Sequence, residues 1–410
     1  MTTRRILLAD ADAFYVAVAR LVDPDGAGKA KCLIVGGSAS GRGVVTSASY
    51  EAREYGVRSA MPTAQALRLC PHATVVPVSG EACSEKSQEI LHALEDFTPV
   101  VEPASIDEFY LDMTGTETLY HHEPLETTAM RIRQAVRDST GLWVSIGGGT
   151  SKLLAKLAAK VAKPRPGQDG TGVHIVPAGD ELAFMRTLDL AAIPMIGPKL
   201  QERLATFGLK RVEDVLPHDE RRLMAWLGKR TGRWLARRVR GLDESVVIPR
   251  GKRVSIGHEE TFPRDLETDE DLDRELIHLV VRLTGDMRRK GLSARTITIK
   301  LRDHDFTTRQ ASRTFKDAVS TDRTVLDTAR KLLARLRTER LAPARLLGVS
   351  LSHLTKDPAA GQLSLFDIPS SLETERDKTL ARIVDDIGDR YGRRSIVRGS
   401  EVTRSKQWER

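Results

Sequence analysis

The sequence predicts a protein of the α+β class that is divided into several domains. Three observations support this prediction. Strand-like and helix-like segments alternate through the first 180 residues, short helices without strands occupy about residues 180 to 240, and a strand–helix–strand–strand–helix–strand order begins near residue 253. A chain of 410 residues is long enough for several hydrophobic cores.

The first region is expected to form a mixed sheet with helices packed on it. Its order is a strand in "RRILLAD", a strand in "KCLIVGG", a helix in "AMPTAQALRLC" that opens near Pro62, a strand in "ATVVPV" and a helix in "SEKSQEILHALEDF". Extended segments then flank a turn in "VVEPASIDEFYLDM". A helix in "EPLETTAMRIRQAVRDSTG" and a strand and helix in "WVSIGGGTSKLLAKLAAKVAKP" complete the region.

The second region is expected to be a small helical domain. Gly and Pro punctuate short helices such as "PKLQERLATFG" and "RTGRWLARRVRG", and the basic connector "VIPRGKRV" follows.

The third region has the order βαββαβ, which implies one antiparallel sheet with two helices on one face. The first helix opens with a capping box from Thr268 to Asp271. The expected elements are strand 253–261, helix 269–290, strand 294–302, strand 308–314, helix 322–338 and strand 344–353.

The strand "ARTITIKLR" shows what the uncovered face of this sheet carries. Apolar residues alternate with Thr, Lys300 and Arg302, so the polar set is expected on the open face. We expect the neighbouring strand to add Arg309 and Arg313. Such a face is either simply solvated or contacts phosphate groups.

Charge is unevenly distributed along the chain. Residues 1–170 carry 18 Lys and Arg against 20 Asp and Glu, a net of −2, whereas residues 171–410 carry 46 against 36, a net of +10. A basic second half suggests a polyanionic partner such as nucleic acid.

No segment has the roughly 18 apolar residues that a membrane helix needs, and "MTTRRILLAD" does not read as a signal peptide. We therefore expect a cytoplasmic protein without membrane contact. Cys32, Cys70 and Cys83 share no CxxC spacing and no histidine cluster, so they are expected to be reduced, buried thiols that form neither disulfides nor a zinc site.

Acidic residues stand at the ends of two predicted strands. Asp10 ends the first strand, and Asp107 and Glu108 lie between two extended segments, where a turn or bulge would let both serve one site. Three clustered carboxylates repel one another unless cations fill the cluster, and magnesium prefers such oxygen ligands. The alternative is that these acids are solvated turn residues.

Six segments, in this order and at these intervals, resemble the Y-family DNA polymerases, specifically the bacterial lesion-bypass type called DNA polymerase IV or DinB. They are "DADAFY", "SYEAREYGVRSAMP", "SIDEFYLD", "SIGGGTSKLLAKLAAKVAKP", "IPMIGPKLQERLATFG" and "LLGVSLSHL". The resemblance runs from about residue 4 to 355 and implies a multidomain right-hand polymerase. Its parts would be a palm at 1–12 and 80–168, fingers at 13–79, a helical thumb at 169–240, a βαββαβ little finger at 250–355 and a tail at 356–410.

The resemblance implies error-prone, template-directed DNA synthesis past lesions by a monomer, with primer–template DNA and deoxynucleoside triphosphates as substrates. Asp10, Asp107 and Glu108, with the backbone carbonyl of Ala11, would bind two Mg²⁺ ions. Asp12 would face elsewhere and be structural. Tyr15 would be a steric gate that excludes ribonucleotides, whereas Phe14 is expected in the core. The triphosphate would be held by Ser47, Tyr50, Arg53 and Lys163. The run Gly147–Gly149 departs from the sequence that is usual in the family at this position.

Contacts to DNA would come from the thumb and the little finger. "IPMIGPKL" resembles a helix-hairpin-helix in which Gly197 permits a tight turn and Pro198 opens a helix, so that the exposed amides and Lys199 could hold a backbone phosphate. The sheet residues for DNA would be Lys300, Arg302, Arg309 and Arg313.

The segment "QLSLF" is similar to the peptide by which bacterial replication proteins dock on the sliding clamp. Gln362 and Leu363 begin it, and Leu365 and Phe366 would fill an apolar pocket. After it, Leu380, Ile383, Val384, Ile387 and Tyr391 keep helical spacing and are expected to pack on something.

Two other functions are considered. A catalytically inactive Y-family relative could act as a scaffold in a lesion-bypass complex, but it would lack one or more of the three acids. A metal-dependent nuclease would leave the nucleotide motifs and the clamp-like peptide unexplained.

Overall fold

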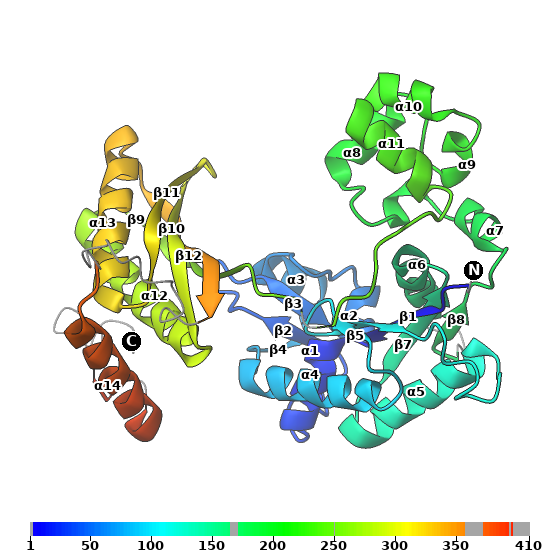
Figure 1. Ribbon diagram of the computed structural model, residues 1–410, viewed down its shortest axis with the longest axis horizontal. Coiled ribbons are helices and arrows are strands. Elements are labelled where there is room, and N and C mark those ends of the chain that lie inside the picture. The colour runs from blue at the N-terminus through cyan, green and yellow to red at the C-terminus, as the bar shows by residue number, and fades with distance from the viewer. Residues whose placement is uncertain (1–2, 165–170, 250, 357–371, 393–394, 397–410) are drawn as a thin grey trace, which may run out of the picture. The chain divides into compact units, whose positions relative to one another are not determined.

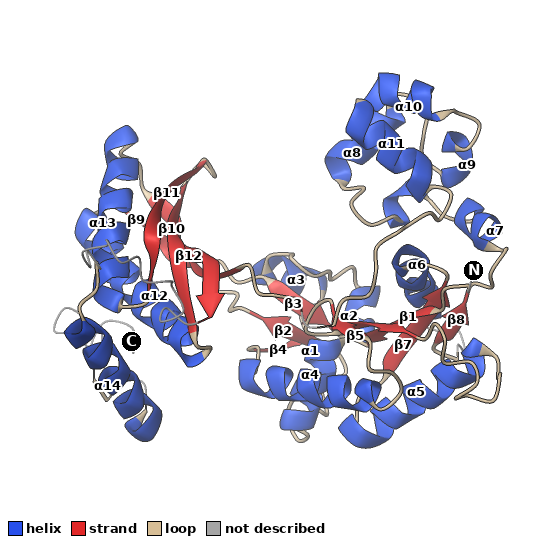
Figure 2. Ribbon diagram, in the orientation of Figure 1, coloured by secondary structure: helices blue, strands red, loops and turns tan. Residues whose placement is uncertain are grey.

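The computed structural model describes residues 3–164, 171–249, 251–356, 372–392 and 395–396. The chain forms two compact units, Met1–Gly251 and Lys252–Arg410. Both units combine helices with antiparallel strands, which confirms the predicted α+β class (Figures 1 and 2). None of the helices in the described part of the chain has the length and apolar character that crossing a bilayer requires.

A five-stranded mixed sheet forms the centre of the first unit. Its strand order is β5-β6-β1-β7-β8, and all neighbours are antiparallel except β7 and β8. The bounds are β5 (Val101–Pro103), β6 (Glu108–Asp112), β1 (Ile6–Ala11), β7 (Val144–Gly149) and β8 (Val173–Ile175). The opening strand of the chain is therefore the middle strand of the sheet.

Side-chain alternation along β1 divides the sheet into two faces. Leu7 and Ala9 belong to the core cluster that includes residues of α4 (Gly80–Glu95) and α5 (Leu125–Thr140). Ile6 and Leu8 belong to a second cluster with α6 (Lys152–Ala162). Figure 1 shows α4 and α5 on one side of this sheet and α6 on the other. By the same alternation, Asp10 faces α6.

The glycine run of β7 lets α6 approach the sheet closely. Gly147 lies opposite Leu8 on the α6 face, and a Cβ atom placed on it would lie 2.0 Å from the backbone N of Ala159 and 2.2 Å from the backbone O of Ala155. The run is a regular strand, and the missing side chain is what sets the depth of the helix.

The segment between the first strand and α4 forms its own three-stranded sheet, so the expectation of one mixed sheet in this region is wrong. The order is β3-β2-β4, with β2 antiparallel to β3 and parallel to β4. The elements are α1 (Phe14–Val22), β2 (Leu33–Gly36), β3 (Val45–Ala48), α2 (Tyr50–Glu54), α3 (Thr63–Leu69) and β4 (Thr74–Val76). Pro62 precedes α3, as predicted.

Residues 181–238 are helical, as predicted, and pack on the outer side of α6. Leu153, Leu154 and Leu157 of α6 share a core cluster with residues of these helices. The helices are α7 (Glu181–Arg186), the 3₁₀ turn η1 (Leu190–Ala192), α8 (Pro198–Ala205), α9 (Val212–Val215), α10 (Glu220–Leu227) and α11 (Lys229–Arg238).

The second unit has the predicted βαββαβ order. Its antiparallel sheet has the order β11-β10-β12-β9, and both α12 and α13 lie on one side of it (Figure 1). The bounds are β9 (Ser255–Leu266), α12 (Asp269–Arg289), β10 (Leu292–Asp303), β11 (Thr308–Val319), α13 (Asp322–Glu339) and β12 (Ala344–Lys356). The Thr268 hydroxyl accepts the Asp271 amide, as expected for the cap of α12.

The predicted tail helix is present as α14 (Glu375–Tyr391), but the expectation that its apolar stripe is packed is wrong for Leu380, for Ile383, which is 49% exposed, and for Tyr391. Leu380 is 60% exposed and Tyr391 is 75% exposed. Polar contacts attach the helix instead, because the Arg288 guanidinium donates to Asp385 at 2.6 Å and 2.8 Å and to Asp322 at 2.7 Å.

Candidate active site

The three predicted acids lie at the edge of the central sheet where β1 and β6 meet. Asp10 is directly opposite Glu108 in the antiparallel register. Asp107 occupies the turn before β6, and its carbonyl accepts the Ala11 amide at 2.9 Å. The Ser105 hydroxyl lies 2.5 Å from the Asp107 Oδ1 and accepts the Glu108 amide at 3.0 Å. The chain therefore bends at Asp107 and enters β6 at Glu108, and that both side chains serve one site stays a prediction.

Two lysines, Lys156 of α6 and Lys163 directly after it, pair with these acids. The Lys163 Nζ lies 2.7 Å from the Asp10 Oδ1, and the Lys156 Nζ lies 2.8 Å and 2.6 Å from the two Glu108 oxygens. Lys156 was not predicted. Its spacing of seven residues from Lys163 is about two helical turns, but this spacing alone does not distinguish it from the other lysines of α6.

Asp10 is the most strongly perturbed of the three carboxyls. Burial raises its pKa to about 6; Lys163 opposes this rise, and the charges of Glu108 and Asp107 add to it. Only 8% of the residue is exposed. A buried carboxylate with like charges beside it is a favourable position for a cation.

The donor set fits a hard divalent cation, because it consists of three carboxylates with the Ala11 carbonyl at the same sheet edge. The carboxylate oxygens of the three acids do not all lie within 4.8 Å of one another. Lys163 and Lys156 hold two of the acids toward α6. A bound cation would have to compete with these ammonium groups.

Three of the four residues predicted for the triphosphate lie on β3 and α2, and the fourth, Lys163, follows α6. Ser47 is buried on β3, and the Arg53 guanidinium lies over the Tyr50 ring at 5.0 Å and donates to the Ala48 carbonyl at 2.9 Å. The Tyr50 hydroxyl is buried and has no hydrogen-bond partner among the residues that the structure describes. A buried hydroxyl without a partner is costly and marks a position where a ligand oxygen would be stabilising.

Asp12 has a structural contact, since it accepts the Ser145 hydroxyl at 2.7 Å. Its charge nevertheless acts on Tyr50, one of the residues predicted to bind the triphosphate. The pKa of Tyr50 rises to about 12, first because of burial and then because of Asp12.

Phe14 and Tyr15 begin α1 and differ in burial. Phe14 is 2% exposed and lies in the core, as predicted. The Tyr15 ring is partly exposed and meets the Phe14 ring edge-on at 5.4 Å. Burial raises the pKa of Tyr15, and the charge of Asp107 adds to this, so Tyr15 lies near the acids.

The open face of the second unit's sheet carries Lys300 and Arg302, as predicted. Lys300 pairs with Glu259 of β9, and the Arg302 Nε donates to the Thr308 hydroxyl at 2.9 Å. The register places mostly small or polar residues beside them: Thr296, Thr298, Gly348, Ser350, Ser352, Gly257 and Ser312. Such a surface lets an extended backbone approach closely.

Arg309 and Arg313 do not lie on that face, and their predicted placement is corrected. Arg309 is opposite Leu301, which faces the helices, and it donates to Asp303 at 2.9 Å and to the carbonyl of Leu336. Arg313 is opposite Ile297, and its guanidinium lies over the Phe315 ring at 4.9 Å. The charge of Arg309 is therefore used within the fold.

The hairpin predicted to hold phosphate has the expected helix but a different turn residue. Pro198 is the first residue of α8, and Lys199 in the same turn is exposed. Gly197 has φ −80°, whereas Met195 has φ +73° and is 81% exposed. The left-handed residue of the turn is thus Met195, and Gly197 is not required for it.

The clamp-like peptide of Gln362, Leu363, Leu365 and Phe366 lies outside the described residues. In the sequence it falls between β12, which ends at Lys356, and α14, which begins at Glu375.

Comparisons with known proteins agree with this geometry. The model of the impB/mucB/samB family matches residues 9–160, and that of the C-terminal domain of the same family matches residues 253–365. A DNA polymerase IV of Desulfatibacillum aliphaticivorans is 36% identical over 403 residues, which cover 98% of each chain. The chain belongs to the Y-family of DNA-directed DNA polymerases, in the DNA polymerase IV group.

Other members of the family are similarly related. A DNA polymerase IV of Halorhodospira halophila is 38% identical over 356 residues, which cover 86% of this chain and 96% of the relative. Among solved structures, a Y-family DNA polymerase chimera that contains Dbh is similar in fold, with a TM-score of 0.74, 24% identity and coverage of 86% and 100% of the two chains. A post-insertion binary complex of Dbh DNA polymerase has a TM-score of 0.61 at 25% identity, with the same coverage.

Proposed function

We propose that this Y-family polymerase extends a primer opposite damaged template positions by nucleotidyl transfer that depends on two Mg²⁺ ions. The observation that supports this most is the opposition of Asp10 and Glu108 across β1 and β6, with Asp107 in the adjoining turn. The family depends on divalent metal in general. An inactive scaffold would not need this arrangement of acids.

Asp10, Asp107 and Glu108 would hold the ions, together with the Ala11 carbonyl. Bound there, magnesium would favour deprotonation of the primer 3′-hydroxyl and would stabilise the negative charge that develops on the triphosphate. The protein supplies the rigid edge, because the three acids are fixed by sheet pairing, by Ser105 and by the Ala11–Asp107 hydrogen bond.

The incoming triphosphate would be held by Tyr50, Arg53, Lys163 and the Ser47 hydroxyl. The unpartnered Tyr50 hydroxyl supports this role, since it could donate a hydrogen bond to a phosphate oxygen. Lys163 is within reach of the acids, so it can bridge the acid cluster and the phosphates.

Tyr15 would limit the space at the sugar of the nucleotide, because its ring is partly exposed beside Asp107. Overpacking costs roughly 1 to 3 kcal/mol, so Tyr15→Ala should raise ribonucleotide insertion relative to deoxynucleotide insertion by about ten- to a hundredfold. Single-nucleotide insertion efficiencies measure this ratio, and an unchanged ratio would show that Tyr15 is only core packing.

Primer–template DNA would be bound by sequence-independent contacts. The residues that we propose are Lys300 and Arg302 on the open sheet face and Lys199 with the amides that begin at Gly197. The parts would be the palm, fingers, thumb, little finger and tail with the boundaries given above, and a monomer would act in the cytoplasm.

Leu365 and Phe366 would dock on a sliding clamp. Direct binding of a Leu365→Ala/Phe366→Ala variant to a clamp tests this proposal.

The decisive experiment replaces two acids by their amides. Asp107→Asn with Glu108→Gln should abolish primer extension in magnesium while duplex affinity stays within about twofold, because several kcal/mol of transition-state stabilisation are lost without loss of phosphate contacts. The matched control is Asp138→Asn, an exposed acid on α5 that accepts a hydrogen bond from Gln134. Extension within about tenfold of the parent would exclude the assignment.

A further inference from the structure

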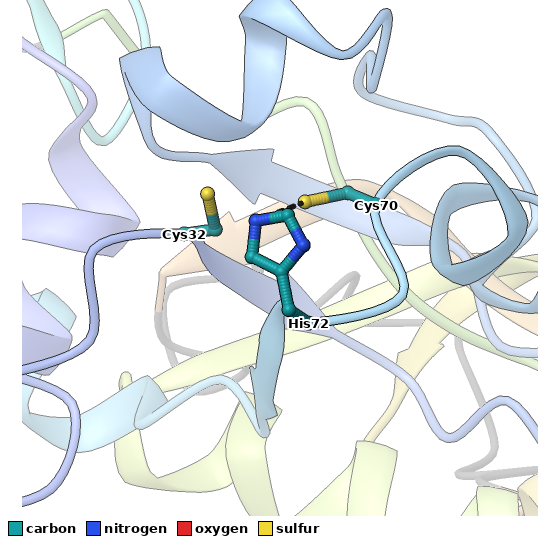
Figure 3. Close-up of side chains that lie close together, drawn as sticks. All are labelled: Cys32, Cys70 and His72. Carbon is teal, nitrogen blue, oxygen red and sulfur yellow. Dashed lines mark hydrogen bonds between the residues drawn. The ribbon is translucent and has the colours of Figure 1, made fainter.

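Cys32, Cys70 and His72 lie close together in the structure. Cys32 is distant in sequence from the other two, and the expectation that the cysteines have no histidine clustered with them is wrong. Cys32 directly precedes β2, Cys70 caps the C-terminus of α3, and His72 lies in the turn before β4. The parallel pairing of β2 with β4 brings them together, since the Thr74 amide donates to the Cys32 carbonyl at 2.9 Å. Figure 3 shows the three side chains lying close together.

The ligand atoms have the spacing and chemistry of a zinc site. The two sulfurs and the imidazole nitrogen all lie within 4.8 Å of one another, and the Cys70 Sγ lies 3.6 Å from the His72 Nε2. Zn–S and Zn–N bonds of about 2.3 Å and 2.05 Å at a tetrahedral angle would separate S from N by about 3.6 Å. Both thiols are buried and free of disulfides.

We propose that Cys32, Cys70 and His72 bind one zinc ion in this three-stranded sheet. His72 is exposed, so solvent can reach the site and supply a fourth ligand. Each thiol releases its proton to solvent as the metal–sulfur bond forms. This is the one cluster of three such ligands that the described residues contain within this distance.

The position of the site indicates a structural role. The three ligands would connect the start of β2, the end of α3 and the start of β4, and β2 also pairs with β3, which carries Ser47. Since metal bound only to the folded state adds its binding free energy to folding, zinc should stabilise this region. The proposal does not depend on polymerase activity.

The test is cobalt binding by the full-length protein after metal removal and full reduction. Co²⁺ alone should bind with one equivalent that shows a thiolate-to-cobalt charge-transfer band, and Zn²⁺ should displace it. The acids near Asp10 offer only oxygen ligands, so cobalt bound there gives no such band. Absence of the band, or a disulfide between Cys32 and Cys70 under these conditions, would overturn the proposal.

Variants separate the site from the rest of the chain. His72→Gln changes an exposed side chain, so it should leave the fold intact while weakening Zn²⁺ affinity by at least about tenfold and removing the zinc-dependent rise in melting temperature. Cys70→Ser should remove most of the charge-transfer band. The control is Cys83→Ser, because Cys83 is a third buried thiol that belongs to a different core cluster. Unchanged affinity in His72→Gln, or loss of the band in Cys83→Ser, would contradict the site.

Discussion

At the scale of single residues, Asp10 shows a conflict between folding and the proposed metal site. Its carboxyl is almost fully buried, and its pKa is raised to about 6 even though Lys163 contacts it. Burial therefore outweighs the ion pair, and the charged form costs stability. A position of this kind is kept for what it binds rather than for what it contributes to the fold.

Asp10→Asn should accordingly stabilise the metal-free protein near neutral pH. The folded protein holds the Asp10 proton more tightly than the unfolded chain, so the stability of the parent falls as pH rises from about 4 through about 6, and the variant lacks this loss. A shift of about two pKa units gives a gain of about 1 to 3 kcal/mol at pH 7 and little difference at pH 4.

Unfolding midpoints measured with a chelator at both pH values check this expectation, with Asp138→Asn as the control. A variant that is less stable than the parent at pH 7 would show that the loss of the Lys163 pair dominates.

At the scale of elements, α6 and β7 together set the geometry of the candidate active site. α6 carries Lys156, and Lys163 follows its last turn, so its depth on the sheet positions both ammonium groups at the acids. That depth depends on Gly147, where a side chain would meet helix backbone.

Gly147→Ala should therefore displace α6. Backbone cannot yield as a side chain does, so the cost should be about 3 kcal/mol or more, and the melting temperature should fall by about 5 °C or more. Primer extension should fall more steeply than duplex binding. Gly80→Ala is the matched control, since Gly80 opens α4 with free space around it and should be neutral or slightly stabilising. An equal melting temperature in both variants would contradict the role of Gly147.

Most elements could be predicted from local pattern, and what failed, apart from the faces of β11, depended on long-range pairing. The βαββαβ order followed from alternation and caps, whereas the separate three-stranded sheet and the meeting of Cys32 with Cys70 depend on how strands pair in space. The faces of β11 were predictable, because Arg309 and Arg313 share the parity of Ala311 and Phe315, which are buried. Lys156 could not be chosen over other exposed-looking lysines without knowing which face of α6 meets the acids.

At the scale of the whole molecule, charge rather than sequence readout should dominate DNA binding. Residues 1–251 carry 32 Lys and Arg against 30 Asp and Glu, a net of +2, and residues 252–410 carry 32 against 26, a net of +6. A protein that neutralises phosphates releases counterions, so affinity falls steeply with salt. The open sheet face is the place where we expect this effect to arise in the second unit.

Lys300→Ala with Arg302→Ala should lower the slope of log affinity against log salt by about one to two, because each lost phosphate contact removes about 0.9. Lys300 should contribute less than a full phosphate contact to this slope, since a phosphate must displace its partner Glu259. Arg313→Ala is the control with the same type of charge, because Arg313 pairs with Ile297 and so lies on the helix-side face, where it is more exposed to solvent than Lys300 and Arg302 are on the open face. Fluorescence anisotropy of a labelled primer–template between about 50 and 200 mM salt measures all three slopes. If Arg313→Ala lowers the slope as much as the double variant, DNA contacts the helix-side edge of β11 and the open face is only solvated.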